Sequence, residues 1–232
     1  LLESAADRGG WVLRLKARMG VMSELQVDAE SASLETVMYS SRAMRRLEPT
    51  AVSESLLLKL IDAANQAPSG SNAQQTRWIV VRDPDQKKKL ADLNRLHGAP
   101  YIQAEVDQPR DAKHKRLVDA VVWQMDHMHE APALIVACYD YDEPVSGGEV
   151  YRKAGSVWPG IQNLLLMARS LGLGAAPTTL ALRDHAMVRA ALDLPETFAA
   201  LCMIPVGYPS GRFGPVTRKP VSTIMRFDRW SQ

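Results

Sequence analysis

Three short apolar runs, separated by longer stretches with helical periodicity, limit the folds open to this chain. The runs cover residues 76–82, 133–139 and 198–206, and each is bounded by residues that favour turns or loops. Short apolar runs in that setting are typical of buried β-strands. Because long helical patterns lie between them, the sequence predicts one domain of the α/β class rather than two domains.

The predicted helices begin at residues that cap helices well. Ser33 precedes a short helix, Ser53 precedes one that continues to Pro68, and Asp83-Pro84 opens one that ends near His97-Gly98. Loop is expected over residues 99–110. Further helices are expected over residues 111–130, 150–171 and 183–192. From residue 208 the chain is rich in Pro, Gly and Arg, and a long irregular arm of this kind favours wrapping around a second copy.

Charge and cysteine content narrow the functional class. The 28 basic and 26 acidic residues leave a net charge of +2, all of which lies in residues 1–20, so no nucleic-acid partner is expected. No apolar run approaches the length of a membrane span. Cys138 and Cys202 each lie inside an apolar run, which predicts buried thiols and fits a cytoplasmic protein. Residues 1–30 are expected to be a mobile leader or upstream extension.

The stretch Ala-Pro-Ser-Gly-Ser-Asn-Ala-Gln-Gln, residues 67–75, lies between a predicted helix and a predicted strand. Pro68 stops the helix, and Gly70 permits a tight turn or a positive φ. Ser69, Asn72 and their neighbours place short polar groups beside exposed backbone N–H donors. Such a loop can hold an oxygen-rich ligand, although an ordinary helix-to-strand turn would have the same composition.

Arginines gather in two segments that are not predicted helix faces. Arg42, Arg45 and Arg46 follow the first helix, and Arg212 and Arg218 lie in the C-terminal arm. Arginine binds phosphate through two parallel hydrogen bonds, so these segments are candidate anion sites; a solvated basic surface is the alternative. Residues 174–180 are small and extended, and their backbone could approach a flat ring and offer it an N–H, unless they only begin a strand.

Several other sites are not indicated. Gly172-Leu173-Gly174 lacks a third glycine and does not join a strand to a helix, so it predicts the end of a helix rather than a dinucleotide site. No phosphate-binding Gly-Lys-Ser/Thr is present. His127 and His129 lie about 200° apart on a helix, so no shared metal is expected. No pairing of a nucleophile with a base is evident either.

The loop of residues 67–75, the two arginine segments and residues 174–180, in this order and spacing, resemble the FMN-dependent nitroreductase family. The resemblance runs from about Leu34 to the C-terminus. Its most specific part is residues 67–74, followed by residues 162–174, 205–209 and 218–220. It implies an α+β fold, with a sheet flanked by helices, in a single domain over residues 31–232 with an extended C-terminal arm. It also implies an intertwined homodimer with two FMN sites at the interface.

The resemblance also implies roles for individual residues. Arg42 and Arg45 match flavin-binding arginines, Arg218 matches the arginine that grips the phosphate, and the backbone N–H of Thr179 would face flavin N5. Residues 68–72 match a loop that reaches the flavin from the other subunit. Two departures are present: Ser41-Arg42-Ala43 replaces the usual Arg-Arg-Ser, and Thr179 replaces an acidic residue. The implied cofactor-binding set is Arg42, Ala43, Arg45, Pro68, Ser69, Gly70, Asn72, Ser156, Pro177, Thr178, Thr179 and Arg218.

The implied activity is flavin chemistry. A hydride from NADH or NADPH would pass through FMN to an electron-poor acceptor such as a nitroarene or quinone, by ping-pong turnover. Arg45 would stabilise the anionic reduced flavin, and no dedicated acid or base is required. Alternatives are a specialised reductase, such as a dehalogenase or enoate-type reductase, and a flavin-binding or storage protein with slow turnover.

Overall fold

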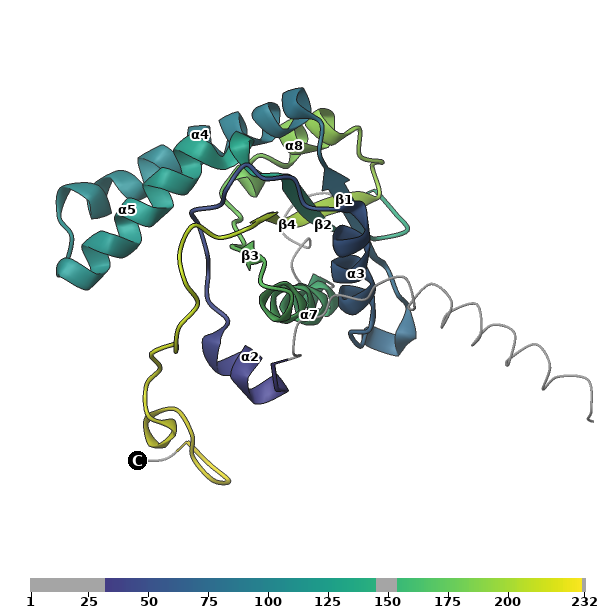
Figure 1. Cartoon of the computed structure of the whole chain (residues 1–232). Coiled ribbons are helices and arrows are strands. Elements are labelled where there is room, and N and C mark those ends of the chain that lie inside the picture. The colour runs from purple at the N-terminus through teal and green to yellow at the C-terminus, as the bar shows by residue number, and fades with distance from the viewer. Residues whose placement is uncertain (1–31, 145–153, 231–232) are drawn as a thin grey trace, which may run out of the picture. The chain divides into compact units, whose positions relative to one another are not determined.

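The structure is a computed structural model that describes residues 32–144 and 154–230 (Figure 1). The leader expected over residues 1–30 and the beginning of the helix expected from Val150 lie outside these residues. The described residues form six α-helices and four β-strands. The helices are α2 (Leu34–Ser40), α3 (Glu54–Asn65), α4 (Pro84–Asp107), α5 (Ala112–His127), α7 (Val157–Ser170) and α8 (His185–Leu192). The strands are β1 (Thr76–Val81), β2 (Ala133–Asp140), β3 (Gly174–Ala175) and β4 (Phe198–Gly207).

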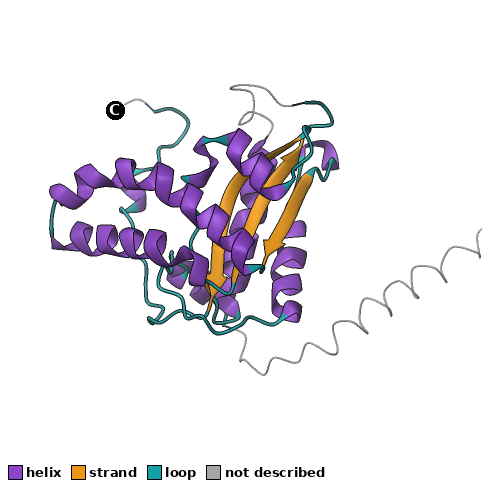
Figure 2. Cartoon of the chain, turned by 90° about the horizontal axis from the view of Figure 1, so that it is seen from above, coloured by secondary structure: helices purple, strands orange, loops and turns teal. Residues whose placement is uncertain are grey.

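The four strands form one sheet in the order β1-β2-β4-β3, and each neighbouring pair is antiparallel (Figure 2). The three predicted strands are confirmed, and so is the α+β class implied by the family resemblance. The α/β class predicted from the pattern alone is wrong. The two antiparallel helices α4 and α5 follow β1 and return the chain to the end of the sheet where β1 finished. The next strand therefore runs back in the opposite direction.

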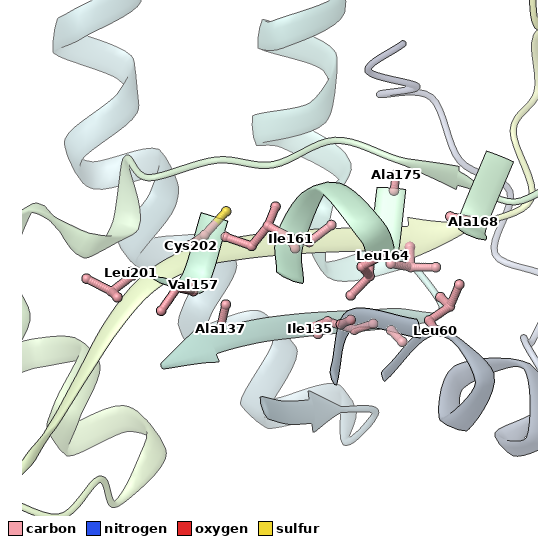
Figure 3. Packing of buried hydrophobic residues seen from close by; sticks show 14 of the residues in the cluster. Leu60, Ile135, Ala137, Val157, Ile161, Leu164, Ala168, Ala175, Leu201 and Cys202 are labelled. Atoms are coloured by element: carbon pink, nitrogen blue, oxygen red, sulfur yellow. The ribbon is translucent and has the colours of Figure 1, made fainter. Parts of the chain in front are cut away.

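Strands β2 and β4 are buried on both faces because helices cover each side, whereas the edge strand β1 is partly exposed. On β2, alternate side chains point to opposite faces, as the period of two in a strand requires. Ile135 and Ala137 pack with α3 and α7, whereas Leu134 and Val136 pack with α4 and α8. Figure 3 shows the first of these clusters, in which Leu60 of α3 and Leu164 of α7 meet the sheet. Three layers thus support the loops described below.

Helix α4 differs most from the sequence prediction. It continues through Pro100 to Asp107 in place of a helix end near Gly98 and a loop over residues 99–110. A proline inside a helix removes one backbone hydrogen bond and costs about 3 kcal/mol. The cost is offset by packing, because the second half of α4 lies against α5, with Arg95 paired to Asp126 and Glu105 to His114. A Cβ on Gly98 would lie 2.6 Å from Sδ of Met125. The two helices are therefore in contact at the position where the sequence predicted that the helix ends and a loop begins.

Other boundaries shift less. The helix predicted over residues 183–192 begins at His185, after a 3-10 turn at Ala181–Arg183. Cys138 and Cys202 are fully buried as free thiols, which confirms that prediction, and burial raises the pKa of each thiol to about 12. No helix in the described part of the chain is long and apolar enough to cross a membrane.

Candidate functional site

Two extended segments lie side by side and carry most of the predicted arginines. Residues 40–47 begin at the last residue of α2, and residues 208–219 begin the C-terminal arm; together we call them the arginine ribbon. Backbone hydrogen bonds join the two strips antiparallel: Glu48 N–H to Tyr208 O at 2.8 Å, Ser210 N–H to Arg46 O at 3.1 Å, and Val216 N–H to Tyr39 O at 3.0 Å. In Figure 1 the purple and yellow segments run together in this way. The pairing explains how residues far apart in sequence share one surface.

The arginine ribbon is strongly cationic. It carries Arg42, Arg45, Arg46, Arg212, Arg218 and Lys219, and the acidic residue next to it is Glu48, exposed at its end. Arg45 is half-buried, and burial lowers the pKa of its guanidinium. Arg45 makes no ion pair or hydrogen bond with the described residues. Because a guanidinium stays charged at neutral pH, this half-buried cation is suited to an anionic ligand.

Further contacts hold the arginine ribbon against α7 and the sheet. Nε of Arg169, on α7, donates to Oγ of Ser40 at 2.9 Å, and its guanidinium lies 4.3 Å from the ring centre of Phe213. Met44 N–H donates to the Ala175 carbonyl at 3.1 Å, which joins the ribbon to β3. A Cβ on Gly174 would lie 2.8 Å from Leu47, so only glycine permits this approach. The sequence did not single out Arg169.

The segment after β3 offers one backbone donor. Thr178 pairs with Met203 of β4 through its N–H, at 2.8 Å, and through its carbonyl, at 2.9 Å. The Thr179 carbonyl accepts from Leu182 at 3.1 Å. The Thr179 N–H has no acceptor among the described residues, and the Thr179 side chain is exposed. This peptide, four residues beyond the contact with the ribbon, is therefore available to a ligand.

The loop over residues 68–74 is arranged differently from the prediction. Positive φ falls at Ser71, Asn72 and Gln74, with φ of 51°, 52° and 53°, and not at Gly70. The N–H donors expected to be free are mostly used within the protein. Gly70 N–H donates to Oγ of Ser156 at 3.2 Å, and the Asn72 and Gln74 N–H groups donate to O and Oγ of Ser69 at 3.0 Å. The loop is thus a fixed, strained surface rather than a row of free donors, and such strain clusters at functional sites.

Beneath this loop lies a shallow hollow with an empty volume of about 320 Å³, counted out to open solvent. The residues that line it include Trp78 of β1, Pro68 and Ser69 from the loop, Asn65 at the end of α3 and Gly160 of α7. Ser156, which holds the loop, also lines it. No group of three or more metal-binding side chains lies within residues 32–144 and 154–230.

Comparison with known proteins identifies the family. A model of the nitroreductase family matches residues 38–208, well over half of the chain. The chain belongs to the nitroreductase family. Within it, a relative from Thermus thermophilus named NADH dehydrogenase is 29% identical over 230 residues, which cover 86% of this chain and 95% of the relative. An iodotyrosine deiodinase from Thermotoga neapolitana is 27% identical over 156 residues, 66% of this chain and 76% of the relative.

Solved structures share the nitroreductase fold. The NADPH:FMN oxidoreductase from Vibrio harveyi, complexed with NAD⁺, matches with a TM-score of 0.66 over 87% of this chain and 79% of that chain. Its sequence identity is 19%, so this likeness shows the fold alone. The fold and family expected from the sequence are confirmed.

Within one nitroreductase chain, the predicted site residues form two separate groups. Arg42, Ala43, Arg45 and Arg218 lie on or along the arginine ribbon, which adjoins residues 177–179. Pro68, Ser69, Gly70, Asn72 and Ser156 lie together at the start of β1. The first group is beyond β4 and the second is at β1, so strands β2 and β4 separate them. Three strand spacings amount to about 14 Å, so one chain does not bring the groups together.

Proposed function

We propose that this protein is an FMN-dependent oxidoreductase that passes a hydride from NADH or NADPH to an electron-poor acceptor such as a nitroarene or quinone. The observation that carries the proposal is Arg45, which is half-buried and has no partner among the described residues. Its neighbour Met44 is hydrogen-bonded to Ala175, four residues before Thr179, whose N–H has no acceptor among those residues either. A ligand with both a phosphate and a polar ring edge would meet these groups. The FMN and NAD⁺ named for relatives within this fold support the choice of cofactor.

The residues present fit FMN. Arg218 and Arg42, exposed on the arginine ribbon, would bind its phosphate through charge-assisted hydrogen bonds. Arg45 would hold the negative charge that develops at the N1 and O2 edge, and the Thr179 N–H would bind at N5. When bound, FMN supplies a reversible carrier of a hydride. The chain's own residues therefore orient the ring and stabilise charge; donor and acceptor would use one face in turn.

A second candidate is reductive dehalogenation, which the iodotyrosine deiodinase relative favours. Assays of the flavin-loaded protein on nitroarenes, quinones and halophenols would separate the two. We expect NAD(P)H oxidation with the first two classes. Halide release that exceeds turnover of nitroarenes and quinones would favour the second candidate, and no turnover on any of them would indicate a flavin-binding or storage protein.

We expect the purified protein to be yellow, with about one FMN per subunit and none of it covalent. The arginine ribbon suits a single phosphate, and the sequence has no dinucleotide fingerprint that would favour FAD. An absorbance spectrum before and after heat denaturation, with chromatography of the released flavin, measures this. Colourless protein that fails to take up added FMN would refute the proposed cofactor.

We also propose that the protein is a homodimer whose flavin sites combine the two groups of residues from different chains. The separation of the groups across the sheet supports this, and so do the apolar side chains exposed on α2 and the C-terminal arm. Phe227 and Trp230 are 83% and 69% exposed, and Leu34 and Tyr39 are also exposed. Such surface is normally covered by a partner. Sedimentation should show a dimer, and a stable monomer that still binds FMN would contradict the proposal.

A further inference from the structure

We infer that Asn94 and Gln124 are positioning residues, which fix the Thr179 peptide so that its N–H points at one place. Both are buried amides, and they lie on the neighbouring helices α4 and α5. The inference rests on the proposed function, because that N–H is the group proposed to face flavin N5. Neither residue lies in the segments with the most specific family motifs, residues 67–74, 162–174, 205–209 and 218–220.

Asn94 acts through the side chain of Thr178. It is 1% exposed, and its Oδ1 accepts a hydrogen bond from Oγ1 of Thr178 at 3.1 Å. The same Oγ1 accepts from the N–H of Leu180 at 3.4 Å. The hydroxyl of Thr178 therefore links Asn94 to the backbone of Leu180, the residue after Thr179. Asn94 thereby fixes the orientation of the Thr178 hydroxyl.

Gln124 acts on the residue before the proline. It is 6% exposed, and its Nε2 donates to the Ala176 carbonyl at 3.4 Å. Since Met203 takes the N–H and carbonyl of Thr178, the polar groups on both sides of Thr179 are occupied by fixed partners. The Thr179 N–H has no acceptor among the described residues, which is the arrangement of a preorganised donor.

The helices also touch this segment directly. A Cβ on Gly98, one turn after Asn94, would lie 2.6 Å from Sδ of Met125 and 3.0 Å from Cδ1 of Leu180. The backbone of α4 is thus in contact both with α5, next to Gln124, and with the residue after Thr179. Because no space remains here, a change at Asn94 should displace the segment rather than be absorbed.

The test replaces Asn94 with leucine, which has a similar shape and cannot accept the hydrogen bond. Oxidised flavin offers an acceptor lone pair at N5, where the reduced form carries hydrogen, so a fixed N–H favours the oxidised form. Asn94→Leu should weaken that preference about tenfold and raise the midpoint potential of the bound flavin by about 30 mV. In the protein without flavin, amide exchange of residues 179–182 should also be about tenfold faster.

The matched control is Lys87→Met. Lys87 is also buried on α4, and its Nζ donates to the Ala131 carbonyl at 2.7 Å, outside the site. Lys87→Met should lower thermal stability without changing the midpoint potential of the flavin or the amide exchange rate of residues 179–182. If Asn94→Leu does not fold, Thr178→Val removes the same hydrogen bond at its other partner, which is partly exposed. It should likewise raise the midpoint potential and speed the amide exchange of residues 179–182.

The outcomes separate the two proposals. A parent protein that binds no FMN refutes the proposed function, while exchange of residues 179–182 still reports on positioning. If FMN binds and neither Asn94→Leu nor Thr178→Val differs from Lys87→Met in potential or exchange, the inference is overturned. Combining Asn94→Leu with Thr178→Val should add little to Thr178→Val alone, because that variant has already lost the bond between the two side chains.

Discussion

Arg218→Glu should weaken FMN binding on the order of 30- to several-thousand-fold. The change removes a charge-assisted contact to the phosphate and sets a like charge against it, which costs about 2–5 kcal/mol. The fold should survive, because Arg218 is exposed and its Nη1 donates only to the carbonyl of its neighbour Thr217, at 3.0 Å. Dissociation constants from fluorescence titration, with circular dichroism, measure both expectations.

Lys219→Glu is the control for this prediction. Lys219 is the next residue, is equally exposed and undergoes the same change of charge. It should weaken binding far less, because a short-range contact and not the summed field of the arginine ribbon is expected to hold the phosphate. Equal losses in the two variants would mean that only the net charge of the arm matters, and parent-like binding by Arg218→Glu would refute the placement of the phosphate.

The sequence predicts the strands of this fold better than their directions. The run that became β2 is apolar at almost every position because helices cover both faces of the sheet, and burial of this kind is visible in composition. Strand direction depends on the number of helices between strands and on how they pack. The helix end predicted at Gly98 concealed the hairpin of α4 and α5. Pro100 is a strong local signal against a helix, and the packing of α4 on α5 that overrides it cannot be read from the sequence.

The same limit applies to the site. Arg45 and Thr179 were predicted from the family resemblance of short stretches, and each has a polar group without a partner in the part of the chain that the structure describes. Asn94, Gln124 and Arg169 carried no signal, since each is one polar residue on an otherwise ordinary helix and acts through contacts distant in sequence. In the loop, glycine was expected to take the positive φ, yet Ser71 and Asn72 take it, because hydrogen bonds that loop N–H groups donate to Ser69 and Ser156 hold the backbone there.

Arg45→Met should slow reduction of the bound flavin by about 10²–10³-fold, the loss typical when one preorganised group is removed from developing charge. Arg45 is half-buried and has no partner within residues 32–144 and 154–230, and burial lowers the pKa of its guanidinium. Its charge is thus incompletely solvated before reaction and gains most when a negative charge appears beside it. Methionine keeps the apolar stem but not the cation. Stopped-flow absorbance with NADH or NADPH under anaerobic conditions measures the rate.

Arg46→Met is the matched control, since it makes the same change one residue further along the arginine ribbon. Arg46 is exposed, and the contact that the structure gives it is through its backbone carbonyl, which accepts from Ser210. That contact survives the substitution, so Arg46→Met should be reduced within about threefold of the parent, as expected for loss of a screened surface charge. If Arg45→Met is reduced as fast as Arg46→Met while both hold FMN, Arg45 serves the stability of the ribbon and not the flavin, and the cation nearest the ring must be sought elsewhere.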